Sequence, residues 1–479
     1  MKKLIISILA ASLALLSAGA QETREPQRET EEPQLETEEP QQEPAYLTLD
    51  QILEIALSEN ASIRVADLEI ERTGYARKGS YAALFPQIDG SGSYQRTIKK
   101  QVMYMDFDMP GMGGGSTDES TAGGASVARD GFEVGRWNTW SAGVSASMPL
   151  VNAQLWKSLK ISDQDVELAV EKARGSRLET VTQVKNAFFT VLLAKEALNV
   201  YKSVYDNAVE NLELTQKKYN AQRASELDLT RAKTTLANAI PNMYDAANSV
   251  ELSLWQLKAV MGVDLHSGID VAGTLRDYTA LLQEARLTDT SLDGNSTLRQ
   301  LAIQAEQLSN TIKMQQNAYL PSLSLAFSYS LNAMANDYKF SQYKWSPYSF
   351  VGLSLSIPIF SGGKRLNAIR QTKVQAAELD IQRTNTERQL QIAIRQYLGI
   401  MDTAIKSYDS AASAVETAQK AYNIARQSYE VGRSTLTDLN DAQLALVQAK
   451  LGECQAIFNY VSAKSDLEGT LGADFTAKQ

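Results

Sequence analysis

Residues 184–219 read VKNAFFTVLLAKEALNVYKSVYDNAVENLELTQKKY, and this stretch indicates the fold most directly. Apolar or small residues recur at alternating spacings of three and four, which is the heptad seam of a coiled coil. Alanine at many of the seam positions permits close packing of the helices. The seam positions are Val184, Ala187, Val191, Ala194, Leu198, Tyr201, Tyr205, Ala208, Leu212, Thr215 and Tyr219.

The same seam returns 210 residues later, from Ile394 to Tyr429. Each seam is followed by a second one, in residues 229–239 and 439–449. A continuous helix from Asn152 to Tyr219 has 68 residues, so it would reach about 100 Å at ~1.5 Å per residue. No compact domain accommodates such a helix. The pattern therefore predicts two long antiparallel helical hairpins, packed either as a solid rod or as a cylinder.

The whole chain is a tandem duplication. Residues 60–94 align without gaps on residues 295–329 at an offset of 235, and Met148-Pro149-Leu150 aligns on Ile357-Pro358-Ile359 at an offset of 209. Each half has the order helix, strand, loop, strand, very long helix, tight turn, return helix. The first strand loop, residues 99–136, is long and holds eight glycines, which predicts a mobile extracellular loop.

The strands alternate apolar with small polar residues, most clearly in residues 323–331 and 351–359. This period of two predicts one apolar and one polar face. A sandwich strand with one solvated face has the same pattern, but each half offers only two such strands. Four strands are too few to close a barrel and leave exposed edges. Closure by several copies resolves this, with strands of about ten residues spanning a bilayer.

The first residues form a predicted signal peptide. Lys2 and Lys3 precede the apolar run 4–16 and the small residues Ala18-Gly19-Ala20, the usual layout of a cleaved secretory signal. Residues 22–42 are three copies of an E-T-x-E-P-Q-x unit, which predicts a solvated, extended spacer. Residues 22–44 supply seven of the nine net negative charges. The rest is only mildly acidic and has no basic stripe, so no nucleic-acid partner is expected.

The sequence offers little for metal, cofactor or catalytic chemistry. The only cysteine is Cys454 and the only histidine is His266, so a zinc site of the usual kind is not available and a small buried residue is the expected role of Cys454. Gly362-Gly363-Lys364 is not a phosphate loop, because position 358 is proline. No cofactor and no enzymatic activity are predicted. After the signal peptide no stretch of 18 apolar residues predicts a membrane helix.

Three segments carry a resemblance to the TolC-like outer-membrane efflux proteins. Residues 47–60, residues 357–364 (IPIFSGGK) and residues 429–439 (YEVGRSTLTDL) resemble that family's first helix, its strand-to-helix junction and its hairpin tip. The resemblance implies a mainly α fold with membrane β-strands. Three copies would form a twelve-stranded β-barrel in outer-membrane lipid, continued by a periplasmic α-barrel. It also implies a passive exit duct that docks to a periplasmic adaptor and an inner-membrane pump.

These observations predict six segments. They are a signal peptide at 1–20, an acidic linker at 21–45, a first efflux-protein repeat at 46–265, a connector at 266–290, a second repeat at 291–472 and a tail at 473–479. A structural or adhesive coiled-coil protein of the envelope and a periplasmic adaptor are the competing interpretations. The duplicated strand pairs favour the duct over both.

The hairpin tips hold the predicted site residues. Ser225 with Asp228, and Thr435 with Asp438, fit the S/T-x-x-D pattern of a capping arrangement at the start of each return helix. Gly432 can end the incoming helix in a left-handed conformation.

Three further expectations concern the exposed turns and the helices beside them. The resemblance implies adaptor docking at the turns, where Arg223 and Arg433 lie, and an acidic gate beside the tip, where the aligned residues are Glu213 and Asn423. An exposed arginine or helix glutamate without a special role is the alternative. Pro241 predicts a kink or an interruption in the first return helix.

Overall fold

The computed structural model describes residues 45–103, 132–283 and 290–472. They belong to one compact unit that begins at Ala45. Residues 1–44, which hold the predicted signal peptide and almost all of the acidic linker, lie outside the described residues. So do residues 104–131, the middle of the predicted loop, and residues 473–479, the predicted tail.

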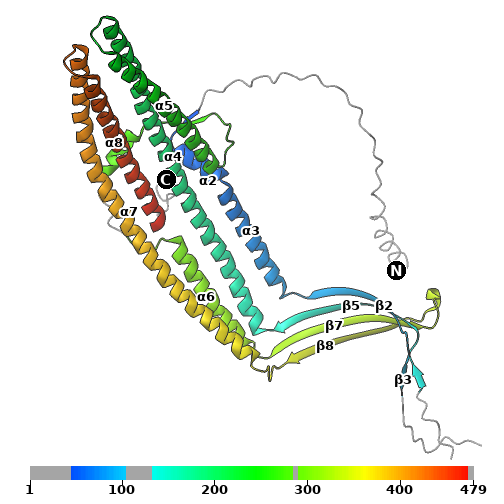
Figure 1. Cartoon of the computed structure of the whole chain (residues 1–479). Coiled ribbons are helices and arrows are strands. Elements are labelled where there is room, and N and C mark those ends of the chain that lie inside the picture. Colours follow the sequence, from blue (N-terminus) through cyan, green and yellow to red (C-terminus); the bar gives the residue numbers. More distant parts are fainter. Residues whose placement is uncertain (1–44, 104–131, 284–289, 473–479) are drawn as a thin grey trace, which may run out of the picture. The chain divides into compact units, whose positions relative to one another are not determined.

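From α3 in the first repeat and α6 in the second, the same order of long elements occurs twice, as the duplication predicts. In Figure 1 the four long strands lie side by side, and α4 and α7 continue from β5 and β8. The first repeat contains α2 (Leu49–Glu59), α3 (Ala61–Ala82), β2 (Gln87–Arg96), β5 (Asn138–Val151), α4 (Ala153–Asn220) and α5 (Glu226–Met261). The second contains α6 (Ser296–Asn317), β7 (Ser322–Ala335), β8 (Ser346–Ser356), α7 (Lys364–Glu430) and α8 (Leu436–Leu471).

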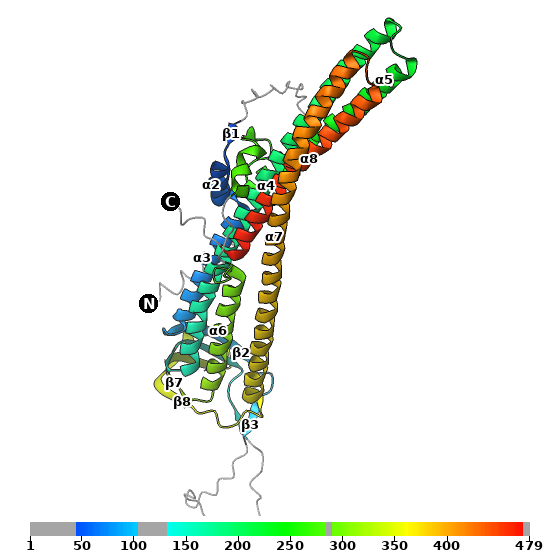
Figure 2. The ribbon, with the colours of Figure 1, turned by 90° about the vertical axis from the view of Figure 1, so that its left-hand side faces the viewer.

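The long helices are uninterrupted, with 68 residues in α4 and 67 in α7. Asn152 caps α4, because its side chain accepts a hydrogen bond from the Leu155 N–H at 3.0 Å. The seam positions Val184 and Val191 are fully buried. The return helices run beside the long ones (Figure 2): α5 packs on α4, whereas α8 packs on both α7 and α4. The predicted hairpins are therefore present.

The helix α5 passes through Pro241 without a break. The predicted interruption is therefore wrong. Proline has no N–H to donate to the carbonyl of Ala237, one turn earlier. Both residues are exposed, so water can satisfy that carbonyl and the helix can continue.

The four long strands form one antiparallel sheet in the order β2-β5-β7-β8. The alternating pattern predicts a strand up to Ile359, but β8 stops at Ser356. Pro358 follows two residues later, and proline cannot donate a ladder hydrogen bond. The base of the predicted first loop is also more ordered than expected. There β3 (Gln101–Met103) pairs with β4 (Phe132–Val134).

The two faces of the sheet differ in chemistry. Cross-strand partners place apolar residues of all four strands on one face, and many of them are exposed. The other face carries mostly serine, glycine, asparagine and glutamine. The exposed apolar residues include Ile88, Val144, Phe327, Tyr329, Val351, Leu353 and Leu355. None of the helices in the described part of the chain has an apolar stretch long enough to cross a bilayer.

Two equivalent junctions join the repeats' short helices to the return helices. Asn60 caps α3 and donates from Nδ2 to the Val260 carbonyl at 2.6 Å. Asn295 caps α6 and donates to the Thr470 carbonyl at 2.8 Å. Each return helix ends there in a left-handed glycine, Gly262 or Gly472. Each asparagine thus accepts a hydrogen bond from the backbone at the start of one helix and donates one to a carbonyl near the end of another.

The segment that connects the two repeats packs against α4 and α8. There β1 (Ala45–Leu47) pairs in parallel with β6 (Ile269–Val271), and the 3-10 helix η1 (Leu275–Gln283) packs on α8. Lys195 on α4 forms an ion pair of 2.6 Å with Asp270. The main core lies where α2, α4, α8 and η1 meet, around Phe188, Leu275 and Ile457.

Cys454 is buried in this core, as the sequence predicts, and burial raises the pKa of its thiol to about 11. Only the thiolate is nucleophilic, so we expect almost no labelling of the folded protein by a maleimide at pH 8. Labelling should be complete after unfolding in guanidinium, and mass spectrometry measures both. Rapid labelling of the folded protein at pH 8 would contradict this burial.

Candidate functional site

The two hairpin tips are built by the same backbone turn. At the first tip the Gln222 N–H donates to the Tyr219 carbonyl and the Arg223 N–H to the Lys218 carbonyl, at 2.9 and 2.7 Å. At the second tip the Gly432 and Arg433 N–H groups donate to the carbonyls of Tyr429 and Ser428 at 3.1 and 2.7 Å. This pair of bonds is a Schellman motif, which satisfies the last carbonyls of the incoming helix.

The motif needs a left-handed residue at its centre. Gly432 supplies it at the second tip with φ of 78°, as the sequence predicts. The first tip uses Gln222 with φ of 56°, the only described residue other than glycine with a positive φ. A side chain in this region costs about 1 kcal/mol or more. The first tip is therefore the more strained of the two.

Both return helices begin with the predicted capping box. The Asp228 N–H donates to the Ser225 hydroxyl at 3.1 Å, and the Ser225 hydroxyl donates to Asp228 Oδ2 at 2.7 Å. Thr435 and Asp438 repeat the arrangement at 3.2 and 2.7 Å. The hydrogen bonds from Thr435 lower the pKa of Asp438. These four residues thus have a structural role at the tips.

Arg223 and Arg433 are exposed at the two turns. Their backbone N–H groups complete the Schellman motifs, and neither guanidinium forms an ion pair within the described ranges. A large apolar side chain is also more than half exposed at each tip: Val431, two residues before Arg433, and Leu227, four residues after Arg223. Each tip therefore presents an exposed arginine and an exposed large apolar side chain.

A cluster of side chains, which we call the hairpin link, joins the two hairpins just behind the tips. The Tyr429 hydroxyl shares a buried 2.6 Å hydrogen bond with the Thr215 hydroxyl. Lys218 donates to the Tyr429 carbonyl, and its ammonium lies 3.8 Å from the centre of the Tyr429 ring. Arg426 forms an ion pair of 2.5 Å with Glu210. An apolar cluster that includes Tyr422 and Leu439 packs around these contacts.

The hairpin link is not evident from the sequence. Thr215 and Tyr429 stand out there only as seam positions, and the pattern of one helix does not show which residues of another helix it meets. The link does perturb its ionisable members: burial lowers the pKa of Lys218 and raises the pKa of Tyr429. The one available signal is the polar Thr215 inside an otherwise apolar seam.

The residues suggested as a gate lie apart from this link. Glu213 is exposed on α4 and forms no ion pair within the described ranges. Asn423 is exposed on α7 and accepts a hydrogen bond from Gln419 at 3.1 Å, one turn earlier on the same helix. No hydrogen bond or ion pair joins Glu213 to Asn423 within this described chain. Their role in a gate remains a prediction.

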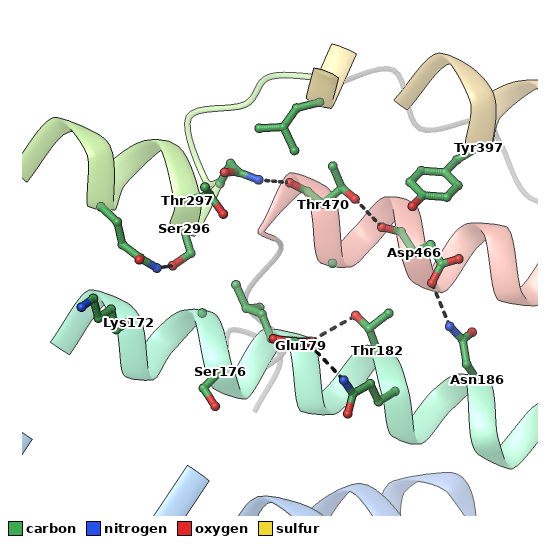
Figure 3. Close-up of a pocket in the computed structure, with 17 residues that line it drawn as sticks. Lys172, Ser176, Glu179, Thr182, Asn186, Ser296, Thr297, Tyr397, Asp466 and Thr470 are labelled. Atoms are coloured by element: carbon green, nitrogen blue, oxygen red, sulfur yellow. Dashed lines mark hydrogen bonds between the residues drawn. The ribbon is translucent and has the colours of Figure 1, made fainter. Parts of the chain in front are cut away.

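A pocket of about 670 Å³ lies far from the tips, beside the junction built by Asn295 (Figure 3). Its polar side chains form hydrogen bonds with one another, both between helices and within one helix. Asn186 of α4 donates to Asp466 of α8 at 2.8 Å, and Gln300 donates to the Ser296 hydroxyl at 3.1 Å. Among the described residues no group of histidine, cysteine and carboxylate side chains could hold a metal ion. Because the polar groups of this pocket bond to one another, the pocket is a junction between helices. The tips are therefore the candidate functional site.

The tips allow a matched pair of substitutions. We expect Gly432→Ala to weaken the second tip by about 1 kcal/mol, because alanine tolerates a positive φ poorly. Hydrogen exchange of the Arg433 amide should then become about fivefold faster. Gln222→Gly should slow exchange of the Arg223 amide, because the strained side chain is removed. If the two substitutions change exchange at their amides in the same direction, the difference in strain between the two tips is contradicted. The same holds if neither substitution changes exchange.

The described chain thus combines a four-stranded sheet with two long helical hairpins that end in similar tips. The chain belongs to the outer membrane efflux protein family, which it matches over residues 52–263 and 287–473. It is an outer-membrane efflux channel that extends into the periplasm. The predicted family, fold, export function and location are therefore confirmed.

Known proteins resemble the chain in sequence and structure. Outer membrane protein TolC of Escherichia coli (strain K12) is 22% identical over 349 residues, 70% of each chain. The Campylobacter jejuni CmeC outer membrane channel is 20% identical, with a TM-score of 0.69 over 90% of this chain and 88% of that one. The outer membrane protein VceC of Vibrio cholerae is 15% identical, with a TM-score of 0.69 over 89% and 96%. At 15% and 20% identity, the similarity of these two solved structures to this chain shows a shared fold.

Proposed function

We propose that three copies of this chain form a passive exit duct without catalytic activity. The duct docks through its tips to a periplasmic adaptor and an inner-membrane pump, and the pump supplies the energy. The observation that carries the proposal is the incompleteness of one chain. Its sheet has two unpaired edges, β2 and β8, and exposed edges in a membrane sheet are costly. A closed sheet built from several copies has none.

The internal duplication indicates how the edges meet. The pairing of β2 with β5 and that of β7 with β8 have the same register: Tyr94 lies opposite Trp140, and their counterparts Tyr329 and Ser349 lie opposite each other. Within the chain, β5 then pairs with β7, with Ser145 opposite Ser328.

The counterpart of β5 is β8, and that of β7 is β2. Equivalent pairing between copies therefore joins β8 of one copy to β2 of the next. At offsets of 209 and 235 residues, Ser145 corresponds to Ser354 and Ser328 to Ser93. Ser354 of one copy is thus expected opposite Ser93 of the next.

The helices support the same assembly. Tyr244 of α5 is 65% exposed, whereas Cys454, at the equivalent place in α8, is 4% exposed. Trp255 is 41% exposed and its counterpart Ser465 is 3% exposed. The face of α8 is covered because α8 packs on α4. By equivalence, α5 packs on α7 of the next copy, which covers Tyr244 and Trp255. Such head-to-tail contacts generate a ring.

The domain boundaries follow from this interpretation. Residues 1–20 are proposed as the signal peptide and 21–45 as a linker. The repeats 46–265 and 291–472 each supply one hairpin and one strand pair, and residues 266–290 connect them. Arg223 and Arg433, with the exposed apolar residues Leu227 and Val431 of the same tips, are proposed to contact the adaptor. Glu213 of the three copies is proposed to add an acidic ring near the tips, with Asn423 beside it.

The test uses pairs of cysteines in the full-length chain, with buried Cys454 left in place. Ser354→Cys with Ser93→Cys should give a covalent trimer on a denaturing gel after mild oxidation, because facing residues lie within disulfide distance. Two control pairs keep Ser354→Cys and combine it with Ser91→Cys or Gln95→Cys, two residues away on the same face. These pairs should cross-link poorly.

Mass and conductance of the same samples complete the test. We expect the mass of a trimer and a measurable single-channel conductance in a planar bilayer. A monomeric mass or a protein that never conducts would refute the duct. Cross-linking of a control pair instead of the Ser93 pair would refute only the register.

A further inference from the structure

The end of the sheet away from the helices carries a continuous row of aromatic rings, which we call the aromatic ledge. The Tyr94 and Trp140 rings lie 4.3 Å apart between centres, and Trp140 and Phe340 lie 5.4 Å apart. Phe340 also contacts Tyr343 and Trp345 at 5.5 and 5.6 Å. The ledge thus runs from β2 across β5 to the connection between β7 and β8.

The ledge lies on the apolar face of the sheet. Tyr94 and Trp140 are cross-strand partners, and they share this face with Leu331, Tyr329 and Val144 of the neighbouring strand positions. Aromatic rings at the end of an apolar band are typical of the boundary between hydrocarbon and lipid headgroups. The groups just beyond the ledge are therefore at headgroup level.

Among the described residues, those groups are mostly cations. Residues 96–103, 132–137 and 336–346 hold six basic and two acidic side chains, although the whole chain has a net charge of −9. The acidic ones are Glu133 and Asp337. Lys100 forms an ion pair of 3.5 Å with Glu133 and lies 4.7 Å from the Trp137 ring centre. The basic side chains are Arg96, Lys99, Lys100, Arg136, Lys339 and Lys344.

Arg96 connects the cations to the ledge. It extends from the same face as Tyr94, and its guanidinium donates to the Tyr338 hydroxyl and lies 5.7 Å from the Tyr338 ring centre. Four other cations, Lys99, Arg136, Lys339 and Lys344, are exposed. None of these four forms an ion pair within the part of the chain that the structure describes. An excess of unneutralised cations at headgroup level attracts anionic lipid groups.

We propose that this rim binds the phosphate groups of a phosphorylated glycolipid of the lipid A type in the outer leaflet. The inference rests on the proposed function, which turns this end of the sheet outward. Arg96 would contact a phosphate next to the ledge, where the aromatic rings cover the upper part of the acyl chains. The four exposed cations would contact further phosphates around the ring of copies.

The experiment uses the full-length protein in detergent, titrated with purified bisphosphorylated lipid A and followed by native mass spectrometry. Dephosphorylated lipid A and phosphatidylglycerol are titrated in parallel. The test variant combines Lys99→Gln, Arg136→Gln, Lys339→Gln and Lys344→Gln, all at exposed positions. The control variant removes the same number of charges from exposed helix lysines, through Lys202→Gln, Lys233→Gln, Lys313→Gln and Lys373→Gln.

We expect the test variant to lose at least about tenfold in affinity for bisphosphorylated lipid A, because each cation near an anionic surface contributes to binding. The control variant should bind like the original chain, and dephosphorylated lipid should bind weakly to all three. The proposal is overturned if dephosphorylated lipid A or phosphatidylglycerol binds as tightly as bisphosphorylated lipid A. It is also overturned if the control variant loses as much affinity as the test variant. Mass and conductance of the test variant report separately on the duct.

Discussion

Replacement of Gly472 by alanine is expected to destabilise the fold by about 3–5 kcal/mol, an unusually large effect for a single methyl group. Gly472 has φ of 71°, and a β-carbon there would overlap the carbonyl oxygen of Gly294. Asn295, next to Gly294, caps α6 and bonds to α8. The added carbon would therefore push apart the junction that joins the two helices.

Gly432→Ala is the matched control. Gly432 also has a left-handed conformation, with φ of 78°, but no heavy atom lies within 4 Å of the position that a β-carbon would take there. The two variants share the cost of backbone strain, and only Gly472→Ala adds the steric overlap. Thermal unfolding and the yield of folded protein measure the difference. Equal losses in the two variants would mean that the junction can yield without cost.

Gly262→Ala extends the comparison to the first repeat. Its β-carbon would lie 2.6 Å from the Glu59 carbonyl oxygen, at the junction built by Asn60. We expect a loss similar to that of Gly472→Ala, because the two junctions are equivalent.

We expect that the hairpin link holds the proposed duct closed at its tips, so that loosening the link opens the duct. The Tyr429–Thr215 hydrogen bond is buried and contributes about 1 kcal/mol, and the partly exposed Arg426–Glu210 pair contributes up to about 1 kcal/mol. Loss of both from the three copies of the proposed trimer amounts to roughly 6 kcal/mol when the copies move together. A shift of about 5.5 kcal/mol takes a two-state equilibrium from 1:99 to 99:1.

We therefore expect Tyr429→Phe combined with Arg426→Ala to raise the mean single-channel current at least about tenfold. The control is Lys420→Ala, which removes an exposed 2.6 Å ion pair with Glu416 within the same helix. That pair does not join the two hairpins, so the current should not change. An unchanged current in the double variant, with the trimer intact, would show that the link does not hold the duct closed.

Much of the site could be predicted from local sequence because its chemistry is local. The S/T-x-x-D spacing predicted both capping boxes, and the glycine at 432 predicted one left-handed turn. Gln222 shows the limit of this reasoning. The surrounding hydrogen bonds hold a glutamine in a conformation that its own preference disfavours. Pro241 shows the same limit, because solvent exposure, which a single helix pattern does not report, lets α5 continue.

The periodic features of this protein can be derived from its sequence alone: the heptad seams, the alternating strands and the duplication that repeats them. These features depend on spacings of two, three and four residues, which each element imposes on its own side chains. Which elements meet is visible only in the folded chain. The hairpin link, the asparagine–glycine junctions and the aromatic ledge join residues tens to hundreds of positions apart, and packing in three dimensions selects those partners.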